Sequence, residues 1–174
     1  MTPEFSRPLT WAAVPENGRQ YRLAATATEC AALAHRFRIL GIAFLQAELN
    51  LKPEVGGTIR VTGVMEAEVT QSCVVTLEPV NQHVKEAVDA RFLPEGRPPS
   101  EDPDGPDELF ADKGSVDLGE AVAEQLALAM DPYPRSPGAT VPTSLEEIDL
   151  PMRDGDKSQQ RPSPFAVLKG GKSS

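Results

Sequence analysis

The stretch Ile59–Thr70 reads IRVTGVMEAEVT, and its alternation decides the fold. Apolar side chains stand at one phase, at positions 59, 61, 65, 67 and 69, and polar ones stand at positions 60, 62, 66, 68 and 70. Successive side chains of a strand point to opposite faces, so this pattern predicts a strand with one buried face. Gly63 interrupts the pattern and predicts either a bulge or a close approach of two backbones.

The same period of two occurs on both sides of this stretch. Residues 43–51 place an apolar side chain at every odd position, and the stretch 82–92 places them at positions 84, 88, 90 and 92. Gly56-Gly57 and Glu78-Pro79 supply turns between the three runs. The region from 42 to 92 is therefore predicted to be an antiparallel meander with one buried face.

Two capping-box patterns predict helices. Thr26–Glu29 precedes an apolar stripe at positions 30, 33, 34 and 37, with Gly41 as a stop, so a helix is expected near 27–39. Asp117–Glu120 precedes a second stripe at positions 118, 122, 126 and 129, which predicts a helix near 116–130 that Asp131-Pro132 ends.

The remaining segments complete the predicted architecture. Leu9–Val14 and Gln20–Leu23 flank a Pro-Glu-Asn-Gly turn and are expected to form a hairpin. The predicted fold class is α+β, with an antiparallel, curved or barrel-like β-sheet and two packed helices.

The expected domain organisation is a single α+β domain over 1–132. Within it, the proline-rich acidic run 94–114 is expected to be a mobile loop that cannot continue the sheet. Residues 133–174 are expected to be a disordered tail, with a short apolar anchor at 164–168.

The charge is unevenly distributed along the 174 residues, whose formal net charge is −9. Residues 1–60 hold seven Lys/Arg and five Asp/Glu, whereas residues 94–160 hold five and sixteen. The overall field repels polyanions, which argues against tight nonspecific binding of nucleic acid. Two cysteines, no secretory leader pattern and no apolar run of membrane-spanning length predict a cytoplasmic protein with no membrane contact.

Catalytic chemistry has little support in the sequence. The two histidines, His35 and His83, have no nucleophile or carboxylate at a recognisable motif spacing, so we interpret them as surface or rim residues. No glycine-rich phosphate loop is present, and the acidic run does not have the spacing of a calcium loop. We therefore expect no enzyme activity, no cofactor and no small-molecule substrate.

Cys73 allows three interpretations: a nucleophile, a metal ligand or a buried apolar residue. No cationic residue lies within nine positions of Cys73 to lower its pKa, and no second cysteine lies two or three positions away. Cys73 also continues the apolar phase of the 59–69 run. These observations favour a buried thiol at a strand end.

Candidate binding residues come from two places. Arg36, Arg38, Lys52 and Arg60 form a candidate phosphate-binding patch, but the signal is weak without interleaved aromatic residues, and four spread cations are more often a solvated face. Phe165 and Leu168 belong to the apolar anchor and are candidate contacts for a partner.

Four segments in order resemble the YceD family of large ribosomal RNA subunit accumulation proteins, most closely its alphaproteobacterial members. They are QSCVVTLEPV (71–80) in the run that starts at Gly63, the acidic stretch ending DELF (107–110), DLGEAVAEQLALAMDPYP (117–134) and PFAVL (164–168). The resemblance implies a cytoplasmic, bacterial, noncatalytic factor that supports 23S rRNA accumulation or processing and large-subunit assembly. Its implied partners are pre-ribosomal large-subunit components, either a ribosomal protein or 23S rRNA.

The first segment also departs from the family pattern. Its family-motif residues are Gln71, Cys73, Thr76, Leu77, Glu78 and Pro79. Many relatives have Cys-x-x-Cys-Leu here, and some have further cysteines near the C-terminus that could complete a zinc site. Thr76 stands at the second cysteine position and no cysteine follows Cys73, so no metal is expected.

The charge distribution leaves two hypotheses for the binding function. Acidic segments are better suited to basic ribosomal proteins than to rRNA, so a protein partner is preferred and direct RNA contact stays open. The alternative function is a general protein-binding adaptor without a ribosomal role.

Overall fold

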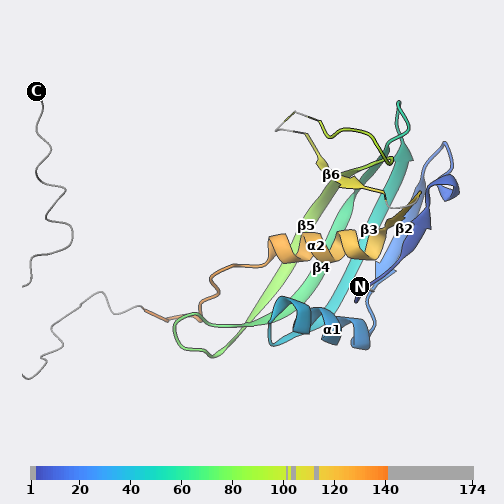
Figure 1. Ribbon diagram of the computed structural model, residues 1–174. Coiled ribbons are helices and arrows are strands. Elements are labelled where there is room, and N and C mark those ends of the chain that lie inside the picture. Colours follow the sequence, from blue (N-terminus) through green and yellow to red (C-terminus); the bar gives the residue numbers. More distant parts are fainter. Residues whose placement is uncertain (1–2, 101, 103–104, 112–113, 141–174) are drawn as a thin grey trace, which may run out of the picture. The chain divides into compact units, whose positions relative to one another are not determined.

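The computed structural model describes residues 3–100, 102, 105–111 and 114–140 (Figure 1). These residues belong to one compact unit, Met1–Thr140. The expected apolar anchor at 164–168, with Phe165 and Leu168, lies outside the described residues. No helix in the described part of the chain is long and apolar enough to cross a membrane.

The unit contains a five-stranded sheet, a two-stranded sheet and two α-helices, which confirms the α+β class. The large sheet has the spatial order β2-β3-β4-β5-β6. Its strands are β2 (Arg19–Ala24), β3 (Gly41–Pro53), β4 (Ile59–Ser72), β5 (Pro79–Leu93) and β6 (Asp107–Phe110). The other elements are β1 (Pro8–Thr10), η1 (Trp11–Ala13), α1 (Ala27–Phe37), β7 (Ser115–Asp117) and α2 (Leu118–Ala129).

The three long strands β3, β4 and β5 form the predicted meander. β4 pairs antiparallel with both neighbours, and its side chains at 59, 61, 65, 67 and 69 are all buried. In β3 the expected phase holds from Leu45 to Leu51 but is wrong at Ala43, which is exposed while Ile42 is buried. A register shift between Ile42 and Phe44 moves the start of the strand to the other phase.

Both predicted helices are present, and the full capping box is found at α1 only, since the Glu120 carboxylate of α2 bonds to Arg36. The Thr26 hydroxyl accepts from the Glu29 amide and the Glu29 carboxylate accepts from the Thr26 amide, so α1 has a complete capping box. α1 ends when Arg38 takes a left-handed conformation (φ 56°), three residues before the expected stop at Gly41. At α2, Asp117 accepts from the amides of Gly119 and Glu120.

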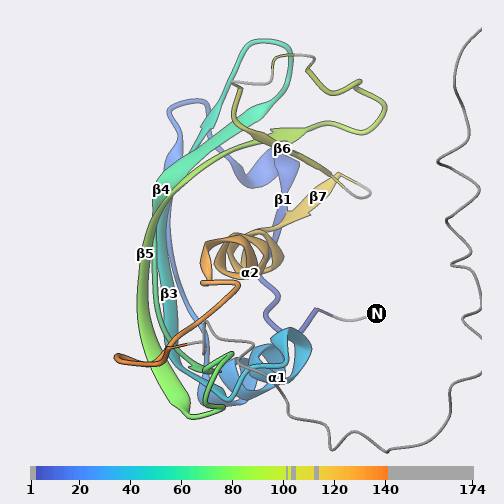
Figure 2. The same ribbon diagram turned by 90° about the vertical axis from the view of Figure 1, so that its left-hand side faces the viewer.

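The buried face of the sheet is covered mainly by α2 and α1. Figure 2 shows the long strands bending around α2, and α1 packs against β3, the strand that follows it. Val122, Ala123 and Leu126 of α2 are at most 1% exposed. A closed barrel is not confirmed, because among the described residues no pairing joins the edge strands β2 and β6.

Three segments differ from the sequence-based expectations. The predicted N-terminal hairpin is wrong: β1 pairs with β7, and β2 pairs with β3. The acidic run 94–114 does continue the sheet, since β6 pairs parallel with the end of β5. Residues 133–136 were expected to be part of the disordered tail, but Pro134 is buried and its carbonyl accepts a hydrogen bond from the Val74 amide. In each case the partner is distant in sequence, which local patterns do not reveal.

Gly63 marks a close approach between β3 and β4. It lies opposite Leu49, and a Cβ atom on Gly63 would come within 2.0 Å of the Glu48 carbonyl oxygen. No side chain fits there without moving the backbone of β3, so only glycine keeps the two strands at this spacing.

We predict that Gly63→Ala lowers the free energy of unfolding by about 3 kcal/mol, because the added methyl group overpacks the sheet. Urea unfolding followed by circular dichroism measures the change. Gly41→Ala is the matched control, since Gly41 lies in the neighbouring strand β3 and nothing lies within 4 Å of its added Cβ. Equal stability of the two variants would contradict the prediction.

Candidate functional site

The connection between β4 and β5 is a tight turn built around Cys73. The Cys73 amide donates to the Glu78 carbonyl (2.8 Å), and the Leu77 amide donates to the Cys73 carbonyl (3.0 Å). The Ser72 hydroxyl also donates to the Leu77 carbonyl (3.0 Å). The predicted turn at Glu78-Pro79 is therefore part of a larger, hydrogen-bonded loop over residues 73–78, called here the Cys73 turn.

The sulfur of Cys73 is fully buried, as predicted, and it accepts several hydrogen bonds. Ser136 donates from its amide (3.3 Å) and its hydroxyl (3.5 Å), and the amides of Val75 and Thr76 each donate at 3.4 Å. The bonds from Ser136 and then Thr76 outweigh burial and lower the pKa of Cys73 to about 6. The sequence reasoning considered only nearby cations and missed these donors.

The segment after α2 runs along the Cys73 turn, as Figures 1 and 2 show. We call residues 131–136 the strap. The Val74 amide donates to the Pro134 carbonyl (2.9 Å), and the Asp131 amide donates to the Gln82 side chain (3.0 Å). The side chain of Gln71 donates to the Asp131 carbonyl (3.0 Å). The strap is thus attached to both strands that the turn connects.

The atoms around Cys73 do not suit a zinc ion. The Thr76 hydroxyl lies 3.2 Å from a Glu78 carboxylate oxygen and 3.3 Å from the Ser136 hydroxyl. One thiol accompanied by two hydroxyls lacks the set of cysteine and histidine ligands that structural zinc requires. Within the described residues no group of three or more His, Cys, Asp or Glu side chains is placed to hold a metal. Thr76 and Ser136 instead link the turn and the strap by hydrogen bonds.

Neither histidine joins this site. His83 is exposed on β5, lies 3.1 Å from Glu66 and is close to the ring of Phe44. His35 is exposed on α1. No hydrogen bond connects either side chain to Cys73 in the described part of the chain, so no thiol and imidazole pair is formed.

The structure does not bring the four predicted phosphate-binding residues together. Arg36 lies on α1 and is engaged by Glu120 at 2.6 and 2.9 Å and by Glu4 at 3.1 Å. Lys52 and Arg60 lie opposite each other on β3 and β4, and Arg60 pairs with Asp89 (2.7 Å). Arg38 caps α1. Two of the four cations are therefore held by carboxylates. α1 leads into the start of β3 at Gly41, whereas Lys52 lies at the other end of that strand.

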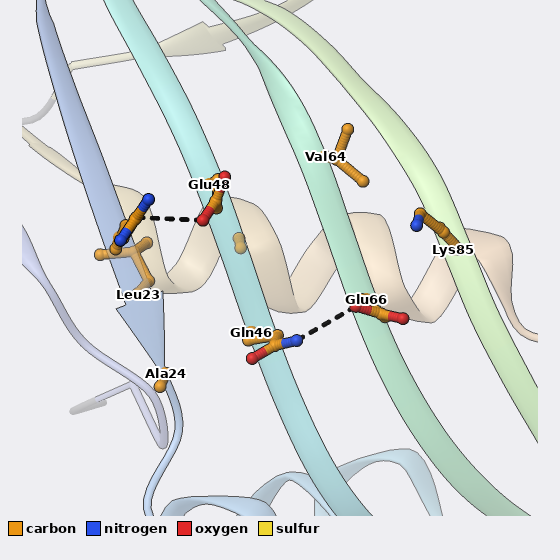
Figure 3. A pocket seen from close by; sticks show the side chains of 9 residues that line it. Leu23, Ala24, Gln46, Glu48, Val64, Glu66 and Lys85 are labelled. Carbon is orange, nitrogen blue, oxygen red and sulfur yellow. Dashed lines mark hydrogen bonds and ion pairs between the residues drawn. The ribbon is translucent and has the colours of Figure 1, made fainter.

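The outer face of the sheet has a hollow that sequence reasoning missed (Figure 3). Its volume is about 450 Å³, and its lining residues are Arg22, Leu23, Ala24, Gln46, Ala47, Glu48, Val64, Glu66 and Lys85. An ion pair between Arg22 and Glu48 (3.0 Å) and a hydrogen bond from Gln46 to Glu66 (3.1 Å) cross its floor. The lining has two positive and two negative side chains, so its formal charge is zero and gives no preference for a cation or an anion.

One comparison with known proteins is informative. The family described as "Large ribosomal RNA subunit accumulation protein YceD" matches residues 61–170, which is more than half of the chain. The chain belongs to the YceD family. No curated protein and no solved structure matches it.

The matched region contains the site described above. β4 from Val61 onward, the Cys73 turn, β5, α2 and the strap lie within 61–170, whereas β2, α1 and β3 precede it. The description of the YceD family links the chain to accumulation of the large ribosomal RNA subunit. The family-motif residues Gln71, Cys73, Thr76, Leu77 and Glu78 all take part in hydrogen bonds of the turn and strap.

We predict that the lowered pKa of Cys73 makes stability rise with pH. Between pH 6 and the ordinary thiol pKa, the unfolded chain binds a proton that the folded chain has released, so stability is lost as pH falls through about 6. Urea unfolding at pH 6, 7 and 8.5 measures the pH dependence of stability, and thiolate absorbance at 240 nm measures the pKa of Cys73. Cys73→Ser should lack this pH-dependent component, and parallel curves for the two proteins would contradict the prediction.

We predict that Arg36 supports the fold by joining α1 to α2. Arg36→Gln and Glu120→Gln should each destabilise the protein, and a double-mutant cycle should give a coupling of about 0.5–1 kcal/mol, because the pair is bidentate but partly exposed. Thermal unfolding of the four proteins measures the coupling. Arg38→Gln serves as the control for loss of a neighbouring charge. A coupling of zero would show that Arg36 is free for another role.

Proposed function

We propose that this protein is a noncatalytic ribosome-biogenesis factor that supports 23S rRNA accumulation and large-subunit assembly by binding a protein component of the precursor particle. Membership of the YceD family carries the ribosomal part of this proposal. The structure contributes the argument for a binding function and for the kind of partner.

The buried state of Cys73 supports a noncatalytic role. A lowered pKa favours the nucleophilic thiolate, but the side chain is 0% exposed and its sulfur is surrounded by donors from the turn and the strap. A substrate would have to displace the strap to reach the sulfur. We therefore assign Cys73 to positioning the strap.

The use of the basic residues supports a protein partner over RNA. Arg36 and Arg60, two of the candidate phosphate ligands, are neutralised by Glu120 and Asp89. Residues 1–140 contain 12 Lys/Arg and 21 Asp/Glu, so the compact unit carries the whole formal charge of −9. Such a unit repels RNA phosphates and attracts basic proteins, which are the common protein components of ribosomes.

The alternative is a general protein-binding adaptor with no ribosomal role. The acidic compact unit would attract a basic partner of that kind equally well. Only the rRNA phenotype separates the two hypotheses, because the adaptor predicts normal large-subunit levels in cells that lack the protein.

We predict that cells depleted of this protein contain less mature 23S rRNA relative to 16S rRNA and fewer free large subunits. Northern blots with probes against both rRNAs, and sucrose-gradient profiles, measure the two quantities. Cys73→Ser keeps a side chain that accepts hydrogen bonds and should restore the normal ratio, whereas a thiol-dependent enzyme would not be restored. An unchanged 23S to 16S ratio after depletion would exclude the proposed function.

A further inference from the structure

We propose that the Cys73 turn and the strap form the docking surface for a basic protein of the large subunit, with Leu77 as the central apolar contact. This inference rests on the proposed function and names the surface that would carry it. Three observations support it: the exposure of apolar side chains, the backbone conformation at Leu77 and the rigidity of the turn.

Three large apolar side chains are exposed on these two segments. Leu77 is 76% exposed, Tyr133 is 69% exposed and Val74 is 48% exposed. The bond from the Val74 amide to the Pro134 carbonyl and the contact between the Thr76 and Ser136 hydroxyls hold the two segments side by side. Apolar residues gathered in this way on a monomer surface are typical of protein contact sites.

Leu77 has an unfavourable backbone conformation for its side chain. Its φ angle is 63°, in the left-handed region that glycine and asparagine adopt more readily than leucine. A leucine buried in the core would be retained for packing, but this side chain points mostly into solvent. This conformation therefore lowers the stability of the isolated protein, and residues with such strained backbones are frequent at binding sites.

The turn that presents Leu77 is held in one conformation. The Leu77 amide and carbonyl are both bonded within the turn, to the Cys73 carbonyl and the Ser72 hydroxyl. The bonds from Ser136 to the Cys73 sulfur attach the strap to the same turn. A surface that is already ordered loses little conformational entropy when a partner binds.

The charges near the surface favour a basic partner. Glu78 and Asp131 are exposed on the turn and the strap, and Arg135 is the cation of the same segments. The compact unit as a whole is strongly acidic, as shown above. An apolar side chain of the partner would contact Leu77 and Val74, while its basic residues would meet the acidic surroundings.

The test uses Leu77→Asn, which removes the apolar side chain but tolerates the left-handed backbone. The immobilised full-length protein is incubated with RNA-free proteins extracted from purified large subunits, and separately with protein-free 23S rRNA. Retained proteins are identified by mass spectrometry. We expect the wild type to retain one or a few basic proteins and Leu77→Asn to retain them about tenfold less, with no loss of thermal stability.

Val55→Gln is the matched control, because Val55 is 99% exposed in the connection between β3 and β4, at the opposite end of β4 from the Cys73 turn. This control should retain the same proteins as the wild type does. The difference in retention between the two variants should persist at about 0.3 M salt, which screens nonspecific attraction between exposed charges. Leu77→Gly is a second variant, which relieves the backbone conformation and should also lose binding.

Three results would overturn the inference: equal retention by Leu77→Asn and the wild type, retention of 23S rRNA alone, or retention of neither probe. The 23S to 16S ratio after depletion tests the proposed function without reference to this surface. A normal ratio would remove the ribosomal role itself, whereas a lowered ratio with unchanged binding by Leu77→Asn would remove only the docking surface.

Discussion

The fold depends on covering the single apolar face of the five-stranded sheet. This face is formed by the odd-numbered side chains of β4 and by the buried side chains of β3 and β5, and water must be excluded from it. α2 lies against β4 and β5, although it follows β5 by 24 residues of chain that include β6 and β7. The long meander therefore becomes a stable core only when a helix from later in the sequence packs on it.

A small set of polar contacts fixes the position of α2. Asp117 accepts from the Arg7 amide and from the Ser6 hydroxyl as well as from the first amides of the helix. Glu120 then pairs with Arg36 of α1. Asp117 and Glu120 thus connect α2 with the N-terminal segment and α1. Because Arg36 is used in this way, the basic patch suggested by the sequence does not form, and the acidic character of the surface dominates.

The sequence predicts the elements whose signals are local. The alternation in β4 and β5, the capping box at Thr26 and the stripe of α2 all depend on side chains within one strand or helix, and they are found as expected. The pairing of β1 with β7 and of β6 with β5 depends on backbone groups far apart in the chain, which composition does not encode. The register shift after Ile42 had no marker in the sequence either.

The candidate site was predicted only in part for the same reason. The burial of Cys73 follows from the phase of β4, but its hydrogen bonds come from Ser136, 63 positions later in the chain. The residues next to Cys73 in sequence predict only a buried apolar side chain. In the fold, its sulfur is the hydrogen-bond acceptor that joins the turn to the strap. The left-handed Leu77 is likewise invisible in the sequence, since leucine gives no turn signal.

Hydrogen bonds from Thr76 and Ser136 to Cys73 keep the Cys73 turn ordered. Thr76 and Ser136 each donate to the Cys73 sulfur, and their hydroxyls contact each other. The Thr76 hydroxyl also bonds to the Glu78 side chain. Hydrogen bonds require fixed geometry from several partners at once, so the turn, the strap and the ends of β4 and β5 must be ordered together. The bonds that hold the turn therefore also fix the backbone that presents Leu77. The stability of the turn and the presentation of its exposed leucine are therefore one property of the fold.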